Sequence, residues 1–144
     1  MDMNPDQILD AVPYARTLGM QITHVSSEEV RARLDWTPDL TTTGGAMNGG
    51  AIMALADNAG GVLAFVNLPE GASGTSTISS STNFLRGVRD GHVESVTRPL
   101  HRGRTTIVAE TEVFDAENRL VAKVTQARFE RIQGRMSEDR KSVV

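Results

Sequence analysis

The sequence contains no cysteine, few aromatic residues and no long unbroken apolar stretch. The absence of cysteine excludes disulfide bonds and thiolate metal ligands, and it is typical of proteins from a reducing compartment. A membrane-spanning helix needs roughly 18 apolar residues in succession, so no transmembrane segment is predicted. Residues 1–5 also lack the basic and apolar segments of a signal peptide. We therefore expect a cytoplasmic protein with no membrane partner.

Charge of one sign is not in large excess either. The 15 Lys and Arg residues are balanced by 18 Asp and Glu residues, which leaves a net charge of −3 over 144 residues. This slight acidic balance argues against a dedicated nucleic-acid-binding protein. The length and the 39% hydrophobic content suffice for one core, so we expect residues 1–144 to form a single domain. Within it, the polar and aperiodic segment 133–144 is predicted to be a disordered tail.

Small apolar residues are concentrated in the segment 47–65, which predicts the central helix of the fold. Its apolar residues occupy nearly every face of a helical wheel, as in a helix buried on all sides. Asp57 is the single acid there, so it should be hydrogen-bonded, altered in its protonation or placed at a cavity wall. It could hold a neighbouring loop or act chemically. Gly60 and Gly61 each weaken a helix by about 1 kcal/mol, which is tolerable where backbone or a ligand must approach closely.

The segment before this helix, residues 41–50, is small, flexible and rich in glycine near its end. Asn48 is suited to cap the helix, because its side chain can accept a hydrogen bond from a backbone N–H of the first turn. The first N–H groups of a helix lack partners inside it and can bind a carbonyl oxygen or an anion. The residues are compatible with a plain capped loop, or with an oxyanion hole that uses the N–H of Gly49 or Gly50.

The rest of the chain predicts one short helix and six strands. Asn4 and Pro5 begin the short helix, and Gly19 ends it. An apolar helix accompanied by six strands predicts an α+β fold, in which an antiparallel sheet of about six strands wraps around the helix. The free edge of such a sheet favours a dimer. The predicted strands are 20–25, 29–36, 75–86, 91–100, 104–114 and 120–132.

Several short motifs follow one another in the span 18–132. They are Asn48-Gly49-Gly50-Ala51, Leu55-Ala56-Asp57, Thr77, Phe84-Leu85-Arg86, Gly103-Arg104 and Arg119-Leu120-Val121-Ala122. In this order they resemble the hotdog-fold acyl-CoA thioesterases of the phenylacetate-pathway (PaaI-like) group. The resemblance implies the hotdog fold, a homodimer or homotetramer with active sites at the dimer interface, and hydrolysis of a thioester of coenzyme A.

The resemblance also implies roles for individual residues. Asp57 matches the catalytic carboxylate, which acts as general base on water or as nucleophile. Gly49 matches the residue whose backbone N–H polarises the thioester carbonyl, and Thr77 matches a hydroxyl that helps place the water or the acid. The family usually has His where this chain has Asn48. Asn can position a group by hydrogen bonding, but it cannot transfer a proton near neutral pH.

Basic residues are concentrated between positions 86 and 104, and they are the candidates for binding the phosphates of coenzyme A. Arg102 and Arg104, which flank Gly103, are the preferred pair, and Gly50 is expected to contact the substrate. Coenzyme A would be part of the substrate, so no further cofactor is predicted. No His, Asp or Glu cluster has the spacing of a metal site. The arginines of this span are Arg86, Arg89, Arg98, Arg102 and Arg104.

Two other functions are compatible with these residues. Because Asn48 replaces the usual His, the protein could bind acyl-CoA without hydrolysing it. A hotdog hydratase or dehydratase acting on enoyl-CoA is the second alternative, although the histidines His24, His92 and His101 lie far from the helix motif in sequence. The acyl group is expected to be small, and polar or aromatic. That expectation comes from the polar residues Thr77, Ser79, Ser81 and Asn83 on one predicted strand.

Overall fold

The computed structural model describes residues 4–132 as three α-helices, a short 3₁₀ helix (η1) and six strands. The predicted tail at 133–144 lies outside the described residues. In chain order the elements are α1 (Pro5–Ala11), α2 (Pro13–Leu18), β1 (Gln21–Val25), β2 (Val30–Asp35), η1 (Pro38–Leu40), α3 (Gly49–Val66), β3 (Ala72–Phe84), β4 (His92–Arg102), β5 (Thr106–Asp115) and β6 (Leu120–Ile132).

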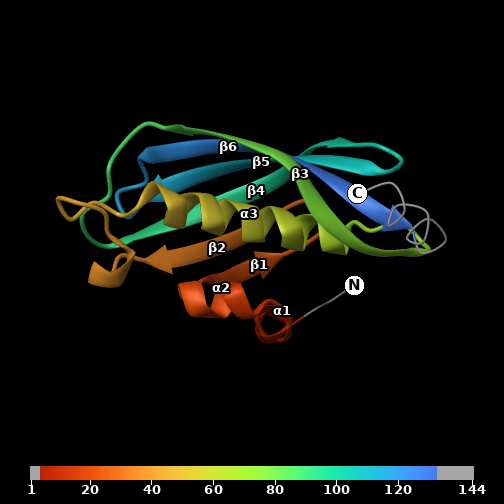
Figure 1. Cartoon of the computed structure of the whole chain (residues 1–144), viewed down its shortest axis with the longest axis horizontal. Helices are drawn as coiled ribbons and strands as arrows, with labels where there is room; N and C mark the ends of the chain where they lie inside the picture. Colours follow the sequence, from red (N-terminus) through yellow and green to blue (C-terminus); the bar gives the residue numbers. More distant parts are fainter. Residues whose placement is uncertain (1–3, 133–144) are drawn as a thin grey trace, which may run out of the picture.

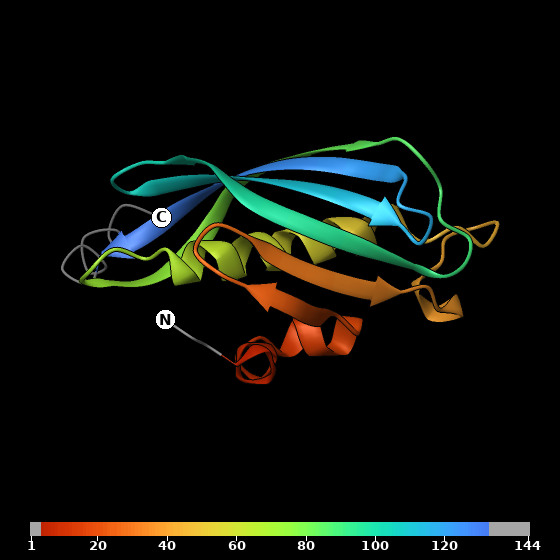
Figure 2. The ribbon, with the colours of Figure 1, turned by 180° about the vertical axis from the view of Figure 1, so that it is seen from behind.

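The six strands form one antiparallel sheet in the order β1-β2-β4-β5-β6-β3. The sheet curls around α3, which lies along its concave face (Figure 1), and the opposite face is seen from behind in Figure 2. The expected α+β hotdog fold, with about six antiparallel strands and one long central helix, is confirmed. β1 and β3 are the two edges of the sheet within the described residues.

Alternating side chains explain why these segments are strands with one buried face. In β5, Ile107, Ala109 and Val113 point inward and are at most 1% exposed, while every second residue, from Thr106 to Phe114, is partly exposed. β2 shows the same alternation, with Val30, Ala32 and Leu34 buried. A strand with one apolar face packs that face on the core, and here the core includes the inner face of α3.

α3 is buried along most of its surface but not on all sides. Leu55, Ala59 and Leu63 are completely buried against the sheet. A stripe on the opposite side, at residues 50, 53, 57 and 65, is exposed, which corrects the prediction of a helix covered on every face. The length and the apolar composition of α3 would suffice for a helix that crosses a membrane. Core helices of soluble proteins meet the same two criteria, and half of the residues of α3 are buried inside the fold.

The N-terminal segment forms two helices rather than the single predicted one. α1 ends at Ala11, and Pro13 occupies the start of α2, where its missing N–H costs no hydrogen bond. Gly19 ends α2 with a φ of +89°, as expected for a glycine after a helix. Ile8 and Leu9 are buried, so α1 packs against the main core (Figure 1).

The hairpins between the long strands follow the sequence closely. Asn118 adopts a φ of +62° in the turn between β5 and β6, as its residue type predicts. β4 continues past Pro99 to Arg102, because a register shift between Pro99 and His101 absorbs the missing backbone donor. The strand therefore ends at the turn of Gly103, two residues beyond the predicted end at residue 100.

Candidate active site

A pocket of about 380 Å³ lies between α1, α3 and the beginning of β3. Its apolar side chains come mainly from the two helices, and its polar ones come from α3, β3 and β6. Asp57 is on its wall. The lining residues are Ile8, Ala11, Val12, Asp57, Asn58, Gly61, Val62, Phe65, Ser73, Gly74, Thr75 and Arg128.

Asp57 is hydrogen-bonded through one of its two carboxylate oxygens. Oδ1 accepts from the hydroxyl of Thr77 at 2.8 Å and from the side-chain amide of Gln126 at 2.8 Å. Within residues 4–132, Oδ2 has no hydrogen-bond partner, and the side chain is 51% exposed. The expectations that Asp57 is hydrogen-bonded and stands at a cavity wall are confirmed. Thr77, which was expected to help place the water or the acid, is thus in direct contact with Asp57.

Arg128 lies behind Asp57 as a buried cation. Its side chain is only 8% exposed, and Nη1 is 3.6 Å from Oδ1 of Asp57. Burial lowers the pKa of the guanidinium, and the nearby Asp57 carboxylate acts in the opposite direction. An arginine keeps its charge in such surroundings because its ordinary pKa is far above neutral pH. The site therefore contains one fixed positive charge next to one half-exposed carboxylate.

The two glycines of α3 make room for side chains from β6. A Cβ atom on Gly60 would lie 2.2 Å from Oε1 of Gln126, and one on Gly61 would lie 3.3 Å from Nη2 of Arg128. The sequence predicted a close approach at this point by backbone or a ligand. The approach is confirmed, but the groups that make it are the side chains of Gln126 and Arg128.

The start of α3 presents one backbone donor without a partner. Asn48 is the N-cap, and its Oδ1 accepts from the N–H of Gly50 at 2.7 Å. The N–H of Gly49 makes no hydrogen bond within residues 4–132. The ring of Phe84 stands beside Gly49, because a Cβ there would be 3.0 Å from Cζ of Phe84. Of the two expected donors, Gly50 is used by the cap and Gly49 is available.

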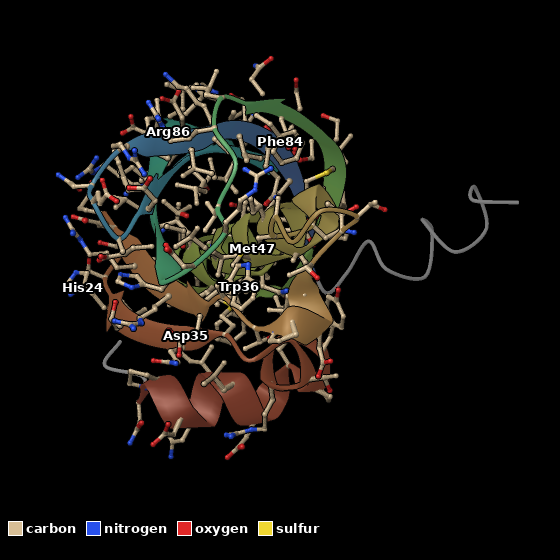
Figure 3. The ribbon with its side chains drawn as sticks, turned by 90° about the vertical axis from the view of Figure 1, so that its left-hand side faces the viewer. His24, Asp35, Trp36, Met47, Phe84 and Arg86 are labelled. Carbon is tan, nitrogen blue, oxygen red and sulfur yellow. The ribbon has the colours of Figure 1, made fainter. Side chains whose placement is uncertain are left out.

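Figure 3 looks onto the end of the molecule at which α3 begins. Phe84 and Arg86 lie on the side of β3 and β6, and Met47 and Trp36 lie closer to the middle. The loop before α3 is held in place by its own contacts. Met47 N–H donates to the carbonyl of Val88, and the indole N–H of Trp36 donates to the carbonyl of Gly45. The helix entrance is thus a fixed feature of the fold.

Comparison with known proteins decides the family. The model of the thioesterase superfamily matches residues 44–122, more than half of the chain. A Mycobacterium tuberculosis protein that bears an esterase name, Rv1847, is 30% identical over 134 residues, covering 92% of this chain and 95% of its own. The chain belongs to the thioesterase superfamily.

One further relative and one solved structure are also similar to this chain. The 1,4-dihydroxy-2-naphthoyl-CoA hydrolase of Escherichia coli is 28% identical over 103 residues, which cover 72% of this chain and 75% of that protein. The crystal structure of a mutant of the thioesterase PA1618 from Pseudomonas aeruginosa superposes with a TM-score of 0.86. It is 20% identical and covers 92% of this chain and 96% of its own, so this likeness concerns the fold.

Two residues expected to act together in a thioesterase are separated within one chain. Gly49 begins α3 and Asp57 follows eight positions later. At a rise of 1.5 Å per residue the two lie about 12 Å apart along the helix axis. A water activated by Asp57 must come within roughly 3.5 Å of the carbonyl carbon that it attacks. One helix therefore cannot bring both groups to one thioester carbonyl.

The arginines expected to bind coenzyme A are also divided between the two ends of α3. Arg102 donates to the carbonyl of Ser27 at 2.7 Å and pairs with Glu28 at 2.8 Å, so its guanidinium is engaged with the β1–β2 turn. That turn is at the C-terminal end of α3, because Asn67 donates to the same carbonyl. Arg86 follows the end of β3 near Gly49. Arg86 and Arg104 are exposed, and neither forms an ion pair within residues 4–132.

Gly103, which was expected to contact coenzyme A, lies in the turn between β4 and β5. Its N–H donates to the carbonyl of Thr106 at 2.7 Å, and a Cβ would lie 3.0 Å from the Thr106 hydroxyl.

The part of the chain that the structure describes has no cluster of three or more His, Asp or Glu that could hold a metal ion. His24, His92 and His101 do not line the pocket of Asp57. Neither do Ser79, Ser81 and Asn83, on which the expected polarity of the acyl group rested.

Sequence reasoning missed Gln126 and Arg128. A signal was present, because the inward positions of β6 alternate from Ala122 and Val124 to Gln126, Arg128 and Glu130, all at most 7% exposed. Three polar residues in phase with a buried apolar face indicate a polar cluster inside the fold. Burial raises the pKa of the Glu130 carboxyl, because the charged form is disfavoured away from water.

Proposed function

We propose that this protein is an acyl-CoA thioesterase of the PaaI-like group, which acts in the cytoplasm on a small, polar or aromatic acyl group. The observation that carries the proposal is the state of Asp57. One carboxylate oxygen is anchored inside the fold, and the other is free at the wall of a pocket. A half-exposed carboxylate held in this way is suited to accept a proton from water.

In the proposed reaction, water adds to the thioester carbonyl while Oδ2 of Asp57 takes its proton. The carbonyl oxygen becomes an oxyanion. The backbone N–H of Gly49, at the start of α3, can stabilise that oxyanion. The intermediate collapses with loss of the C–S bond, and the proton held by Asp57 neutralises the departing thiolate. The products are a carboxylic acid and free coenzyme A. No metal or additional cofactor takes part in this scheme.

The separation of Gly49 and Asp57 supports a homodimer in which two chains complete each site. Two copies of α3 that run antiparallel would place the partner subunit's Gly49 opposite Asp57. The exposed stripe of α3 and the edge strand β3 offer the surfaces for such a pairing. The apolar residues Met53, Phe65 and Ile78 on these two elements are between 41% and 59% exposed. A homotetramer would be a pair of these dimers.

The pocket beside Asp57 is proposed to hold the acyl group. Ile8, Val12, Val62 and Phe65 provide an apolar lining, while Asn58 and Thr75 supply polar groups. Its volume of about 380 Å³ is at the small end of ordinary ligand sites. A compact aromatic group with a polar substituent suits such a lining. The E. coli relative named for a dihydroxynaphthoyl-CoA substrate supports this choice.

A panel of acyl-CoA esters tests the proposal. Release of free thiol should be fastest with aromatic or short polar acyl groups and slow with long fatty chains. Binding without thiol release would instead favour the acyl-CoA-binding alternative. Addition of water to an enoyl-CoA, followed by absorbance, would favour a hydratase. Sedimentation should show a dimer or a tetramer, and a stable active monomer would contradict the shared site.

A further inference from the structure

We propose that Gln126 and Arg128 are positioning residues, which hold Asp57 by Oδ1 and thereby turn Oδ2 toward the substrate. This inference rests on the proposed role of Asp57 as the base. Gln126 and Arg128 would not touch the substrate in this role. They would act through the orientation of the carboxylate, from β6 through the gap left by the two glycines of α3.

The direction of each hydrogen bond follows from Arg128, because a guanidinium can only donate. Its Nη1 carries two protons. One reaches Oγ1 of Thr77 at 2.7 Å, and the other reaches Oε1 of Gln126 at 2.9 Å. The Nε–H is directed at Oγ1 of Thr75 at 3.2 Å. Both protons of Nη1 are therefore used before Asp57 is reached.

Gln126 and Thr77, which accept from Arg128, in turn donate to Asp57. Since the Gln126 oxygen faces Arg128, its NH₂ group must face Asp57, and Nε2 donates to Oδ1 at 2.8 Å. Since Thr77 Oγ1 accepts from Arg128, its own proton is free to donate to Oδ1, also at 2.8 Å. The hydrogen bonds that start at Arg128 thus lead through Thr77 and Gln126 to Oδ1 of Asp57, and Oδ2 remains available.

The surroundings keep this arrangement rigid. Gln126 is 2% exposed and the side chain of Arg128 is 8% exposed, so both side chains are largely removed from water. Oε1 of Gln126 occupies the space that a Cβ atom on residue 60 would fill. The positive charge of Arg128, 3.6 Å from Oδ1, also favours the ionised carboxylate that a base requires.

The two charges of this network differ in exposure. Here the cation is 8% exposed and the carboxylate is 51% exposed. Arg128 is the buried end of the network, and Oδ2 of Asp57 is its exposed end at the pocket wall. That asymmetry fits a support for a reactive group.

The test uses Gln126→Met and Arg128→Met, which remove the donors and keep much of the volume. Misplacing a reacting group by about 1 Å can cost roughly 10²-fold in rate. We expect kcat on the best acyl-CoA to fall by about 10-fold or more in both variants, with KM unchanged, if the carboxylate loses its orientation. Thr111→Val is the matched control. Thr111 is a buried hydroxyl on the same inward face, paired with Thr97 at 2.8 Å and outside the network.

Folded Gln126→Met and Arg128→Met variants with wild-type kcat would overturn the proposal, as would a rise in KM alone. If Arg128→Met fails to fold, Arg128→Lys keeps the charge but cannot reach both acceptors, and the same loss of kcat is expected. A wild-type protein that hydrolyses no thioester would refute the proposed function. The positioning role is then decided by crystal structures of the wild type and Gln126→Met. A rotated Asp57 carboxylate in the variant supports the role, and an unchanged one contradicts it.

Discussion

Gly60 of α3 and Gln126 of β6 approach so closely that a Cβ atom on the glycine would lie 2.2 Å from Oε1 of the glutamine. Gly60→Ala should gain helix propensity of about 1 kcal/mol. The overlap with a 2%-exposed side chain should outweigh that gain, at a cost of about 1–3 kcal/mol for overpacking. We expect net destabilisation in urea unfolding, together with a lower kcat, because Gln126 must leave Asp57.

Gly74→Ala is the control for this substitution. A Cβ on Gly74 would meet nothing within 4 Å, so its effect on the free energy of unfolding should stay within about 0.5 kcal/mol. Equal effects of Gly60→Ala and Gly74→Ala would show that Gln126 yields easily, and that the glycine is not needed for the close approach.

Asn48 should act as a cap and not as a proton donor. Its Oδ1 is committed to the N–H of Gly50, which leaves Gly49 free. Asn48→Ala should cost about 1 kcal/mol of stability and should lower kcat, because the first turn of α3 loosens. Asn4→Ala removes the equivalent cap of α1, with a bond to Asp6 N–H at 2.9 Å, and should cost similar stability without the loss of kcat.

Substitution by histidine decides between the two roles of position 48. If capping is the function, Asn48→His should change kcat little. If proton transfer is needed there, the native protein is already slow, and Asn48→His should raise kcat by about 10-fold or more. Thiol release at neutral pH measures the difference. A large gain would favour an acyl-CoA-binding role for the native chain.

Arg86 and Arg104 should contribute more to coenzyme A binding than Arg102 does. Arg102 is already engaged with Ser27 and Glu28, while the other two are exposed. Arg86→Ala and Arg104→Ala should each raise KM for acyl-CoA but not for a truncated pantetheine ester, and the effect should shrink as salt rises. Arg102→Ala should leave KM unchanged and cost less than about 1 kcal/mol of stability. Equal KM values for all three variants would place the phosphates elsewhere.

Removing the buried charge of Glu130 should stabilise the protein in a pH-dependent way. Burial raises the pKa of its carboxyl in the folded protein above the ordinary value of 4.5. Folding therefore disfavours the charged form, and this cost appears as the pH rises above the unfolded pKa. Glu130→Gln should stabilise the protein at pH 7 and have little effect below about pH 4, where both states are protonated. Thermal unfolding at the two pH values tests this, with the exposed Glu70→Gln as control. Equal gains at both values would rule out charge burial as the cause.

The parts of the fold that local patterns encode could be predicted from sequence. The alternation of β2, the glycine after α2 and the left-handed Asn118 all depend on neighbouring residues. Pro13 was the exception, because a helix ending at Ala11 and another starting at Pro13 give nearly the same apolar pattern as one continuous helix.

The candidate site was predictable only in part, for the same reason. Asp57 and Gly49 belong to one short helical motif, but Gln126 contacts Asp57 across 69 residues of sequence. Arg102 likewise meets Glu28 across 74 residues, a contact that the expected pairing of Arg102 with Arg104 did not include. Contacts of this range depend on strand order, which residue spacing does not contain.

The turnover of Asp57→Asn on an acyl-CoA ester tests the central claim most directly. Asn keeps the size of the side chain and an oxygen for Thr77 and Gln126, but it cannot take a proton from water. With Asp39→Asn as an exposed control, we expect kcat of Asp57→Asn to fall by about 10²-fold or more, while acyl-CoA still binds. Full turnover by a folded Asp57→Asn variant would contradict the account.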